Sequence, residues 1–273
     1  MIATNATRAI SKTNPPGEFA AQIGNPDFVL SLARGLRVIE SFEGHHEGRT
    51  IIEISLSTGL SRAAIRRILL TLELLGYVRR SRQVFHLKSQ VLRLGFSYLS
   101  SSSVVESARP VLERITEQVR ESSSMSMLDG GEIVYVARSA ASRVLAAGLS
   151  VGSHLPAYCT SMGRVLLAAL SDAELEEYLR DLRPRAYTPK TITRIALLKK
   201  AILTARKVGY ALVDEELEAG LRSIAVPVFT RSNQVVAAIN VGTHVTRVDR
   251  ATLLHRCLPA LQEGARTLHN ILI

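Results

Sequence analysis

The sequence predicts an α+β protein with an N-terminal winged helix-turn-helix domain, a linker helix, and a C-terminal α/β domain with a mostly antiparallel sheet. Three observations support this fold class. Residues 50–87 carry the signals for a helix, a turn, a second helix and a hairpin. Residues 61–88 hold seven basic side chains and one acid. Residues 124–241 alternate short apolar strands with amphipathic helices, an order typical of α+β domains.

The first helix of the motif should begin after Thr50. Thr50 and Glu53 have the spacing of a capping box, in which each side chain satisfies a backbone N–H group that the helix start leaves free. Gly59 should end the helix, because glycine readily adopts the left-handed conformation that turns the chain. A preceding helix over residues 27–42, capped by Asp27, should pack beneath it. Its apolar positions are Val29, Leu32, Leu36, Val38, Ile39 and Phe42.

The second helix should cover residues 61–75, with Ser61 as its N-cap. Five apolar residues at helical spacing predict one buried face. They are Ile65, Ile68, Leu69, Leu72 and Leu75. Two short strands follow, residues 77–80 and 83–87, with a tight turn around Ser81-Arg82 between them. These elements together make a winged helix-turn-helix.

The charge of this segment points to DNA. Residues 61–88 carry a net charge of +6, with Glu73 as the one acid. A solvated surface normally mixes signs, whereas binding to phosphates needs an excess of positive charge. Basic winged helices also serve as protein-interaction modules, which is the alternative reading.

An arginine near the start of a recognition helix can pair with guanine through two hydrogen bonds. We therefore assign Arg62, Ala63 and Arg66 to base edges, and Arg67, Arg79, Arg80 and Arg82 to the DNA backbone or the minor groove. Arg34 and Ser61 complete the expected DNA-binding set.

Four segments are expected along the chain. Residues 1–26 lack a periodic face and contain Pro15-Pro16-Gly17, so we expect a disordered tail. Residues 27–88 are the winged helix-turn-helix domain, and residues 89–103 are the linker helix, which ends in a run of serines. Residues 104–273 form the second domain.

The second domain should combine an antiparallel sheet with helices. Asp129-Gly130-Gly131 is a strong hairpin signal between strands at residues 124–128 and 132–137. Further strands are expected at residues 143–149, 210–214, 223–229 and 235–241. Helices are expected at residues 104–119, 161–170, 171–179 and 193–208, and from about Asp249 with a kink at Pro259.

Composition narrows the function classes. The 273 residues carry a net charge of +10, which suits an anionic partner. No apolar run approaches the ~20 residues of a membrane helix, and residues 1–26 lack the apolar region of a secretory signal. The two cysteines make neither a disulfide framework nor a metal pattern, and adjacent His45-His46 lack partner ligands. We expect a cytoplasmic protein without metal or cofactor.

Three further stretches resemble bacterial transcriptional regulators of the IclR type. They are SLARGL at residues 31–36, VGSHLP and YCTSMGR within residues 151–164, and the run from residue 209 through DEE to GLRSIAVP at residue 227. The similarity extends from about Phe28 to the C-terminus. Residues 158–167 and 240–244 are most similar to the branch that controls the β-ketoadipate route of aromatic-acid breakdown.

The resemblance implies a ligand-responsive regulator. It would bind double-stranded DNA at a palindromic operator, pair its subunits through the linker helix into dimers or tetramers, and sense a small organic acid in residues 104–273. Protocatechuate, 4-hydroxybenzoate and β-ketoadipate are the implied effectors. We expect activation of aromatic-acid catabolic genes, with RNA polymerase as a further partner; repression of other catabolic genes is the alternative. No membrane partner and no enzyme activity are expected.

The family's effector pocket can be carried over residue by residue. The matching positions are Leu155, Ser161, Met162, Val213, Leu221, Asn240 and Gly242. The backbone N–H groups of Ser161 and Met162 should lie at a helix start, which favours a carboxylate. Family members that sense acids of two or three carbons have an acid in place of Val213 and hydroxyls in place of Asn240 and Gly242, so this less polar site favours a ring. Arg138 and His244 could add polar contacts or lie at the surface.

Two other functions are alternatives. GLSVG at residues 148–152 matches the G-x-S-x-G pattern of esterases, with Ser150 as nucleophile. That motif needs a strand, a sharp turn and a helix, whereas Pro156 follows closely and no helix is expected before residue 161. The other alternative is a second domain that serves only assembly.

Overall fold

The computed structural model describes residues 25–101, 103–141 and 149–272. The chain divides into two compact units, residues 1–97 and 98–273, and each is described by itself. The predicted tail, residues 1–26, and the predicted strand at residues 143–149 lie almost wholly outside the described residues. Within the described ranges, no helix combines the length and the apolar character that crossing a bilayer requires.

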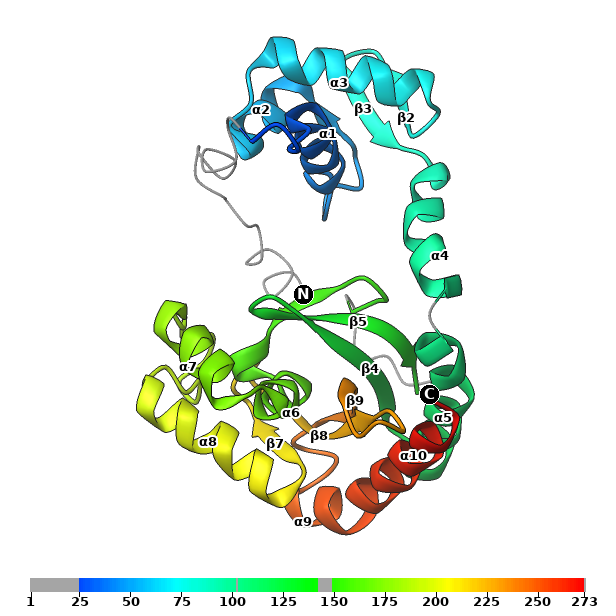
Figure 1. The fold of residues 1–273 in the computed structure, drawn as a ribbon. Coiled ribbons are helices and arrows are strands. Elements are labelled where there is room, and N and C mark those ends of the chain that lie inside the picture. The colour runs from blue at the N-terminus through cyan, green and yellow to red at the C-terminus, as the bar shows by residue number, and fades with distance from the viewer. Residues whose placement is uncertain (1–24, 102, 142–148, 273) are drawn as a thin grey trace. The chain divides into compact units, whose positions relative to one another are not determined.

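Before the linker, the first unit combines helices with a small sheet (Figure 1). The helices are α1 (Leu30–Glu40), α2 (Ile51–Thr58) and α3 (Arg62–Leu74), and the strands are β1 (Arg49–Thr50), β2 (Val78–Ser81) and β3 (Val84–Leu87). The sheet is antiparallel in the order β1-β3-β2. This is the predicted winged helix-turn-helix, to which the structure adds the short strand β1.

Local signals set the ends of α2 and α3 as the sequence predicted. Thr50 Oγ1 accepts the Glu53 N–H, and the Glu53 carboxylate accepts the Thr50 N–H at 2.7 Å, so the capping box is present. Gly59 follows with φ 71°, the left-handed conformation that turns the chain. Ser61 Oγ accepts the Ala64 N–H and caps α3.

Other expectations for this unit were wrong. Asp27 does not cap α1: the helix begins at Leu30, and the cap position is Val29, which has no side-chain acceptor. Helical spacing identifies apolar positions but not what covers them. Four apolar side chains that the periodicity assigned to the core are exposed: Val29, Leu32, Leu36 and Leu75.

The linker is helical, as predicted. A 3₁₀ turn at Ser89–Val91 leads into α4 (Leu92–Ser101), and α5 (Ser103–Val119) begins after it. The division between the two units falls inside α4, after Ser97. Leu92 and Phe96, one helical turn apart, are 73% and 68% exposed and form an apolar stripe on α4.

The second unit is built on one six-stranded antiparallel sheet, which Figure 1 shows. Its strands are β4 (Ser122–Asp129), β5 (Glu132–Ser139), β6 (His154–Pro156), β7 (Ala211–Asp214), β8 (Leu221–Phe229) and β9 (Val235–His244), in the spatial order β6-β5-β4-β9-β8-β7. Gly130, with φ 56°, closes the predicted hairpin between β4 and β5. The sequence did not predict β6, because three residues are too few for an alternating pattern.

Helices α5 and α10 (Leu258–Ile271) lie together against one side of this sheet (Figure 1). They approach closely at Gly264, where an added Cβ would lie 2.7 Å from Ile115 Cδ1. Near Pro259, where a kink was predicted, the structure has a π-helical turn, Leu253–Cys257, just before α10. Proline lacks an N–H group, so the regular hydrogen-bond ladder cannot continue unchanged through this point.

The opposite side of the sheet carries α6 (Ser161–Ala169), with α8 (Ile195–Val208) packed on α6 and α7 (Asp172–Asp181) beside them (Figure 1). The predicted signals hold here too. Ser171 and Glu174 form a capping box at the start of α7, and Gly209, with φ 77°, ends α8. The helix α6 is almost wholly buried, because it lies between the sheet and α8.

Candidate functional site

The first candidate site is the exposed side of α3. With a rotation of 100° per residue, Ala63 and Arg67 lie opposite the buried side of the helix, Arg66 lies on the flank of that exposed face, and Arg62 lies nearer the buried side. All four residues are exposed, and so is Ser61 at the helix start. Arg67, which we predicted to contact the DNA backbone, therefore shares a face with Ala63, one of the predicted base-reading residues.

The wing carries the remaining arginines of this surface. Arg79, Arg80 and Arg82 are all exposed, and Arg82 lies in the turn between β2 and β3 with a left-handed φ of 56°. The guanidinium of Arg80 lies 5.7 Å from the centre of the Phe85 ring, and its Nε donates to Arg82 O at 2.8 Å. These contacts hold Arg80 in place. Arg34 is half-buried on α1.

The second candidate site is the side of the six-stranded sheet that α6 covers. Ser126 Oγ donates to Met162 Sδ at 3.2 Å, which shows that Ser126 faces α6. Opposed residues of antiparallel strands point to the same side. The register therefore places three rows of residues on this side: Arg138-Ser124-Asn240-Ala225, Ser122-Gly242-Ser223-Val213, and His244-Leu221.

Six of the nine residues predicted for the effector pocket belong to these rows. The other three are Ser161 and Met162 on α6 and Leu155 on β6, which is opposite Ile133 of β5. Leu155, Ser161, Met162 and Val213 are each less than a tenth exposed. The structure therefore gathers the predicted residues between α6 and one side of the sheet.

A β-bulge in β5 brings Arg138 to this side. The register between β4 and β5 shifts by one residue at Val136. As a result, Val136 and Ala137 both pack in the core beneath α5 and α10, while Tyr135 and Arg138 both face α6. Arg138 Nη1 donates to Leu149 O at 3.2 Å. Burial raises the pKa of Tyr135 to about 12, and the positive charge of Arg138 partly opposes this rise.

The start of α6 offers hydrogen-bond donors. Thr160 is its N-cap and accepts the Gly163 N–H at 3.2 Å. Ser161 and Met162 are the first two helical residues, whose N–H groups have no acceptor within the helix. Gly163 is required for this geometry, because a Cβ there would lie 2.1 Å from Ala157 O.

On the two layers of this site, two buried polar atoms have no hydrogen-bond partner in the described part of the chain. Ser161 Oγ belongs to α6, and Asn240 Oδ1 belongs to β9 in the centre of the sheet. Ser161 is 1% exposed and Asn240 is 8% exposed. An unsatisfied buried polar atom costs about 1–3 kcal/mol, so such atoms usually have a partner. A polar ligand between α6 and the sheet would satisfy both.

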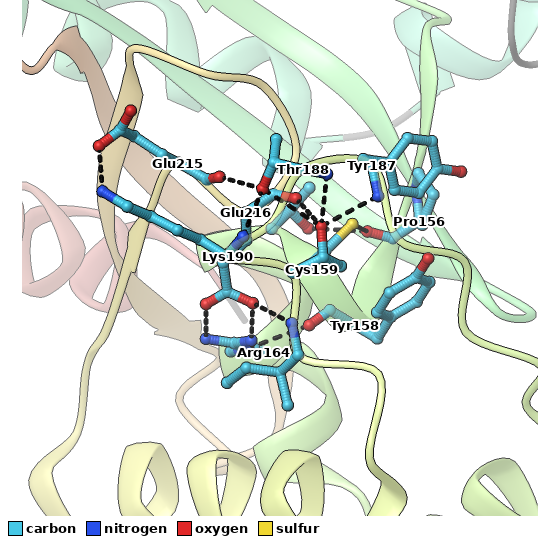
Figure 2. Close-up of polar contacts among 12 residues, drawn as sticks. Pro156, Tyr158, Cys159, Arg164, Tyr187, Thr188, Lys190, Glu215 and Glu216 are labelled. Carbon is cyan, nitrogen blue, oxygen red and sulfur yellow. Dashed lines mark hydrogen bonds and ion pairs between the residues drawn. The ribbon is translucent and has the colours of Figure 1, made fainter.

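A buried ion pair fixes α6 to the connection between β7 and β8 (Figure 2). Arg164 Nη1 and Nη2 donate to the two carboxylate oxygens of Glu216 at 2.7 and 2.5 Å, and the side chains are 5% and 8% exposed. Arg164 Nε also donates to Tyr158 O at 3.1 Å, and Glu216 accepts the Ile192 N–H at 3.2 Å. The pair therefore holds the start of α6 and two neighbouring loops in one arrangement.

The acids of residues 214–216 each bind a different segment. Asp214 makes two bonds with Arg222, at 2.8 and 2.9 Å, which lower the pKa of Asp214. Glu215 pairs with Lys190 and accepts the Gly220 N–H at 3.0 Å (Figure 2). Glu216, the third acid, forms the buried ion pair with Arg164. Sequence reasoning noted this run only as part of the resemblance and gave its acids no role.

His244 and Ser150 have local partners. His244 Nδ1 lies 2.8 Å from Thr246 Oγ1, and its ring packs on Gly220, where a Cβ would lie 2.4 Å from Nε2. Ser150 is exposed, and its N–H donates to Ser153 Oγ at 2.9 Å. In the described residues, the short strand β6 and a 3₁₀ turn follow Ser150, so the helix that a nucleophile elbow requires directly after the serine is not formed.

Family comparisons match both units. The IclR helix-turn-helix domain matches residues 31–82, and the C-terminal domain of the bacterial transcriptional regulator IclR matches residues 96–270. The chain belongs to the IclR family of bacterial transcriptional regulators. Members of the IclR family regulate transcription and are not enzymes, which removes the esterase alternative for Ser150.

Individual relatives span almost the whole chain. The Pca regulon regulatory protein of Pseudomonas putida is 47% identical over 93% of this chain and 88% of its own length. The p-hydroxybenzoate hydroxylase transcriptional activator of Acinetobacter baylyi is 34% identical over 92% of this chain and 94% of its own length. A crystal structure of an IclR homolog complexed with 4-hydroxybenzoate, from Microbacterium hydrocarbonoxydans, has a TM-score of 0.75, with 25% identity over 89% of this chain and 98% of that one.

Proposed function

We propose that this IclR-family chain is a cytoplasmic, effector-responsive activator of genes for aromatic-acid breakdown. The observation that carries the proposal is the pair of buried, unsatisfied polar atoms on Ser161 and Asn240, on the two layers that enclose the candidate site. The relatives named for the Pca regulon and for p-hydroxybenzoate hydroxylase support an aromatic acid as effector. So does the structural relative that holds 4-hydroxybenzoate.

The chemistry of the two layers suggests how such an acid would lie. Its carboxylate would accept hydrogen bonds from the N–H groups of Ser161 and Met162 and from Ser161 Oγ, at the positive end of the α6 dipole. Its ring would pack on Leu155 and Leu221. Asn240 Oδ1 is an acceptor, so the group opposite it should be a donor, such as a ring hydroxyl.

In this arrangement, different residues recognise the hydroxyl and the carboxylate of the ligand. Asn240→Leu removes the acceptor for the hydroxyl but leaves the carboxylate donors in place. Ser161→Ala removes one carboxylate donor but leaves Asn240 in place. The two variants are matched controls for each other, because each changes one end of the proposed ligand.

The test is calorimetric titration of the full chain with 4-hydroxybenzoate, protocatechuate, β-ketoadipate and benzoate. The native chain should bind 4-hydroxybenzoate about tenfold more tightly than benzoate, since one hydrogen bond contributes about 0.5–1.5 kcal/mol. The Asn240→Leu variant should lose this preference. The Ser161→Ala variant should bind both 4-hydroxybenzoate and benzoate more weakly and keep the preference. Absence of binding for all four acids at millimolar concentration would refute the proposal, and an unchanged preference in Asn240→Leu would refute the role of Asn240.

DNA is the second ligand in this proposal. The basic face of α3 and the wing would bind a palindromic operator, with one unit on each half-site of a dimer or tetramer. An effector can shift DNA binding only by its different affinity for two arrangements of the paired subunits. In activation, RNA polymerase would be the further partner; repression would differ in the position of the operator relative to the promoter.

A further inference from the structure

Opposite charges are segregated on two neighbouring helices of the second unit. Residues 182–213 contain eight Lys and Arg residues and no acid. The helix α7, just before this segment, contains five acids and one basic residue, Arg180. The basic segment includes α8, which lies beside α7 (Figure 1). A solvated surface usually mixes charges, so this separation calls for an explanation.

The acids of α7 form an outward stripe. Glu174, Glu177 and Asp181 recur at spacings of three and four residues and are all exposed, on the side away from buried Leu175 and Leu179. Glu174 binds Ser171 in the capping box. Glu177 and Asp181 have no basic partner in the described part of the chain.

The basic residues of α8 form a second outward stripe. Lys200 and Lys207 are seven residues apart, exposed, and directly opposite the buried side of the helix. In the described ranges neither lysine has an acidic partner. Both stripes span seven residues, or about 10 Å at 1.5 Å per residue.

The inner flanks of the two helices already neutralise each other. Lys199 pairs with Glu176, and Arg206 pairs with Asp172 at 2.6 Å. These pairs hold α7 and α8 side by side. By helical rotation, Leu203 lies on α8 between the flank that faces α7 and the lysine stripe, and it is 38% exposed.

We propose that this α7–α8 face binds the same face of a second copy of the chain about a twofold axis. In such a contact the acidic stripe of each copy meets the basic stripe of the other, and Leu203 lies near the axis, where it meets its own copy. The matching lengths of the two stripes support a second copy over another partner. This contact concerns assembly and does not depend on the effector.

Exposed ion pairs are individually weak, but a twofold axis repeats each of them, and complementary potentials favour one orientation. The contact should therefore weaken with salt, because ions screen exposed charges beyond about 10 Å at 0.1 M.

Two charge-reversed variants test the contact. Lys200→Glu with Lys207→Glu makes both stripes acidic, and Glu177→Lys with Asp181→Lys makes both basic. The mass of each full-length variant is measured by light scattering after gel filtration at low salt, beside the native chain. Each variant alone should have about half the native particle mass, and an equimolar mixture should recover it. Arg266→Glu, an exposed charge reversal on α10, is the control and should keep the native mass.

Melting curves establish that the variants are folded, which is expected because all the changed residues are exposed. Native mass in both variants at low salt would overturn the proposal. So would reduced mass in both variants that their mixture fails to restore. Unchanged mass with weaker DNA binding in the Lys200→Glu, Lys207→Glu variant would assign the α8 stripe to DNA instead.

Discussion

Arginines of the same surface have different surroundings, and these decide what each can do. Arg80 is held by the Phe85 ring and by Arg82 O, so its charge is fixed in position on the wing. Arg66 is exposed on α3, and the described part of the chain gives it no ion-pair partner. A free guanidinium on a recognition helix can adjust to the two acceptors of a guanine, whereas a fixed charge suits a phosphate.

Arg66→Ala is predicted to weaken binding to the cognate operator more than binding to random DNA. The expected difference is about 1–3 kcal/mol, because only the correct base offers both acceptors. Fluorescence anisotropy with the two duplexes at one salt concentration measures it. Arg80→Ala is the matched control and should weaken both duplexes equally. Equal losses for Arg66→Ala would reassign Arg66 to the DNA backbone.

For some residues, the sequence could not predict the contacts that the structure shows. Resemblance to the family indicated Ser161 and Asn240, but only the structure shows that their oxygens are buried without partners. The Arg164–Glu216 pair was not predicted, because its members are 52 residues apart and no local pattern connects them. The sequence did place a basic residue and an acid in two recognisable motifs: Arg164 in YCTSMGR and Glu216 in DEE. These two positions were the signal from which the pair could have been suspected.

The β-bulge in β5 is the element that shapes the candidate site. Tyr135 and Arg138 are three residues apart, so strict alternation without the bulge would place them on opposite sides of the sheet. The bulge puts both on the side of the candidate site and leaves Tyr135 6% exposed. Strand alternation alone gives no sign of a bulge, so the sequence could not decide whether Arg138 faced the pocket or the surface.

The buried phenol of Tyr135 should make the protein less stable at alkaline pH. Its pKa is raised from 10.0 to about 12 by burial, so the unfolded chain loses this proton at a lower pH than the folded chain does. The contribution of the protonated Tyr135 phenol to the stability of the fold is complete below pH 10 and is lost as the pH rises through about 12. Between pH 7 and pH 11, the melting temperature should therefore fall more in the native chain than in the Tyr135→Phe variant. Equal falls would contradict the burial of this phenol.

Elements with strong end signals were predicted well. The capping boxes at Thr50 and Ser171 and the glycines at residues 59 and 209 mark helix ends to within a residue or two, because each acts through contacts inside its own turn. The start of α1 and the strand β6 were missed. Neither has such a signal: Val29 offers no cap, and β6 is three residues long.

The whole molecule joins a DNA-binding unit to an effector-binding unit through a helix that belongs to both. The division between the units falls within α4, whose exposed Leu92 and Phe96 offer an apolar stripe for the subunit pairing that the family resemblance implies. An effector held between α6 and the sheet would alter DNA binding by favouring one arrangement of paired subunits. The length and charge of the chain indicated two domains and an anionic partner. They did not indicate which surfaces bind the DNA, the effector or a second subunit.

The most direct test of the proposed function is the affinity of the full chain for DNA upstream of the genes next to its own, measured with and without 4-hydroxybenzoate against random DNA of equal length. Specific binding should exceed random binding by about a thousandfold or more at physiological salt, and the acid should change the specific affinity while leaving random binding unaltered. Equal affinity for both DNAs, with and without the acid, would contradict it.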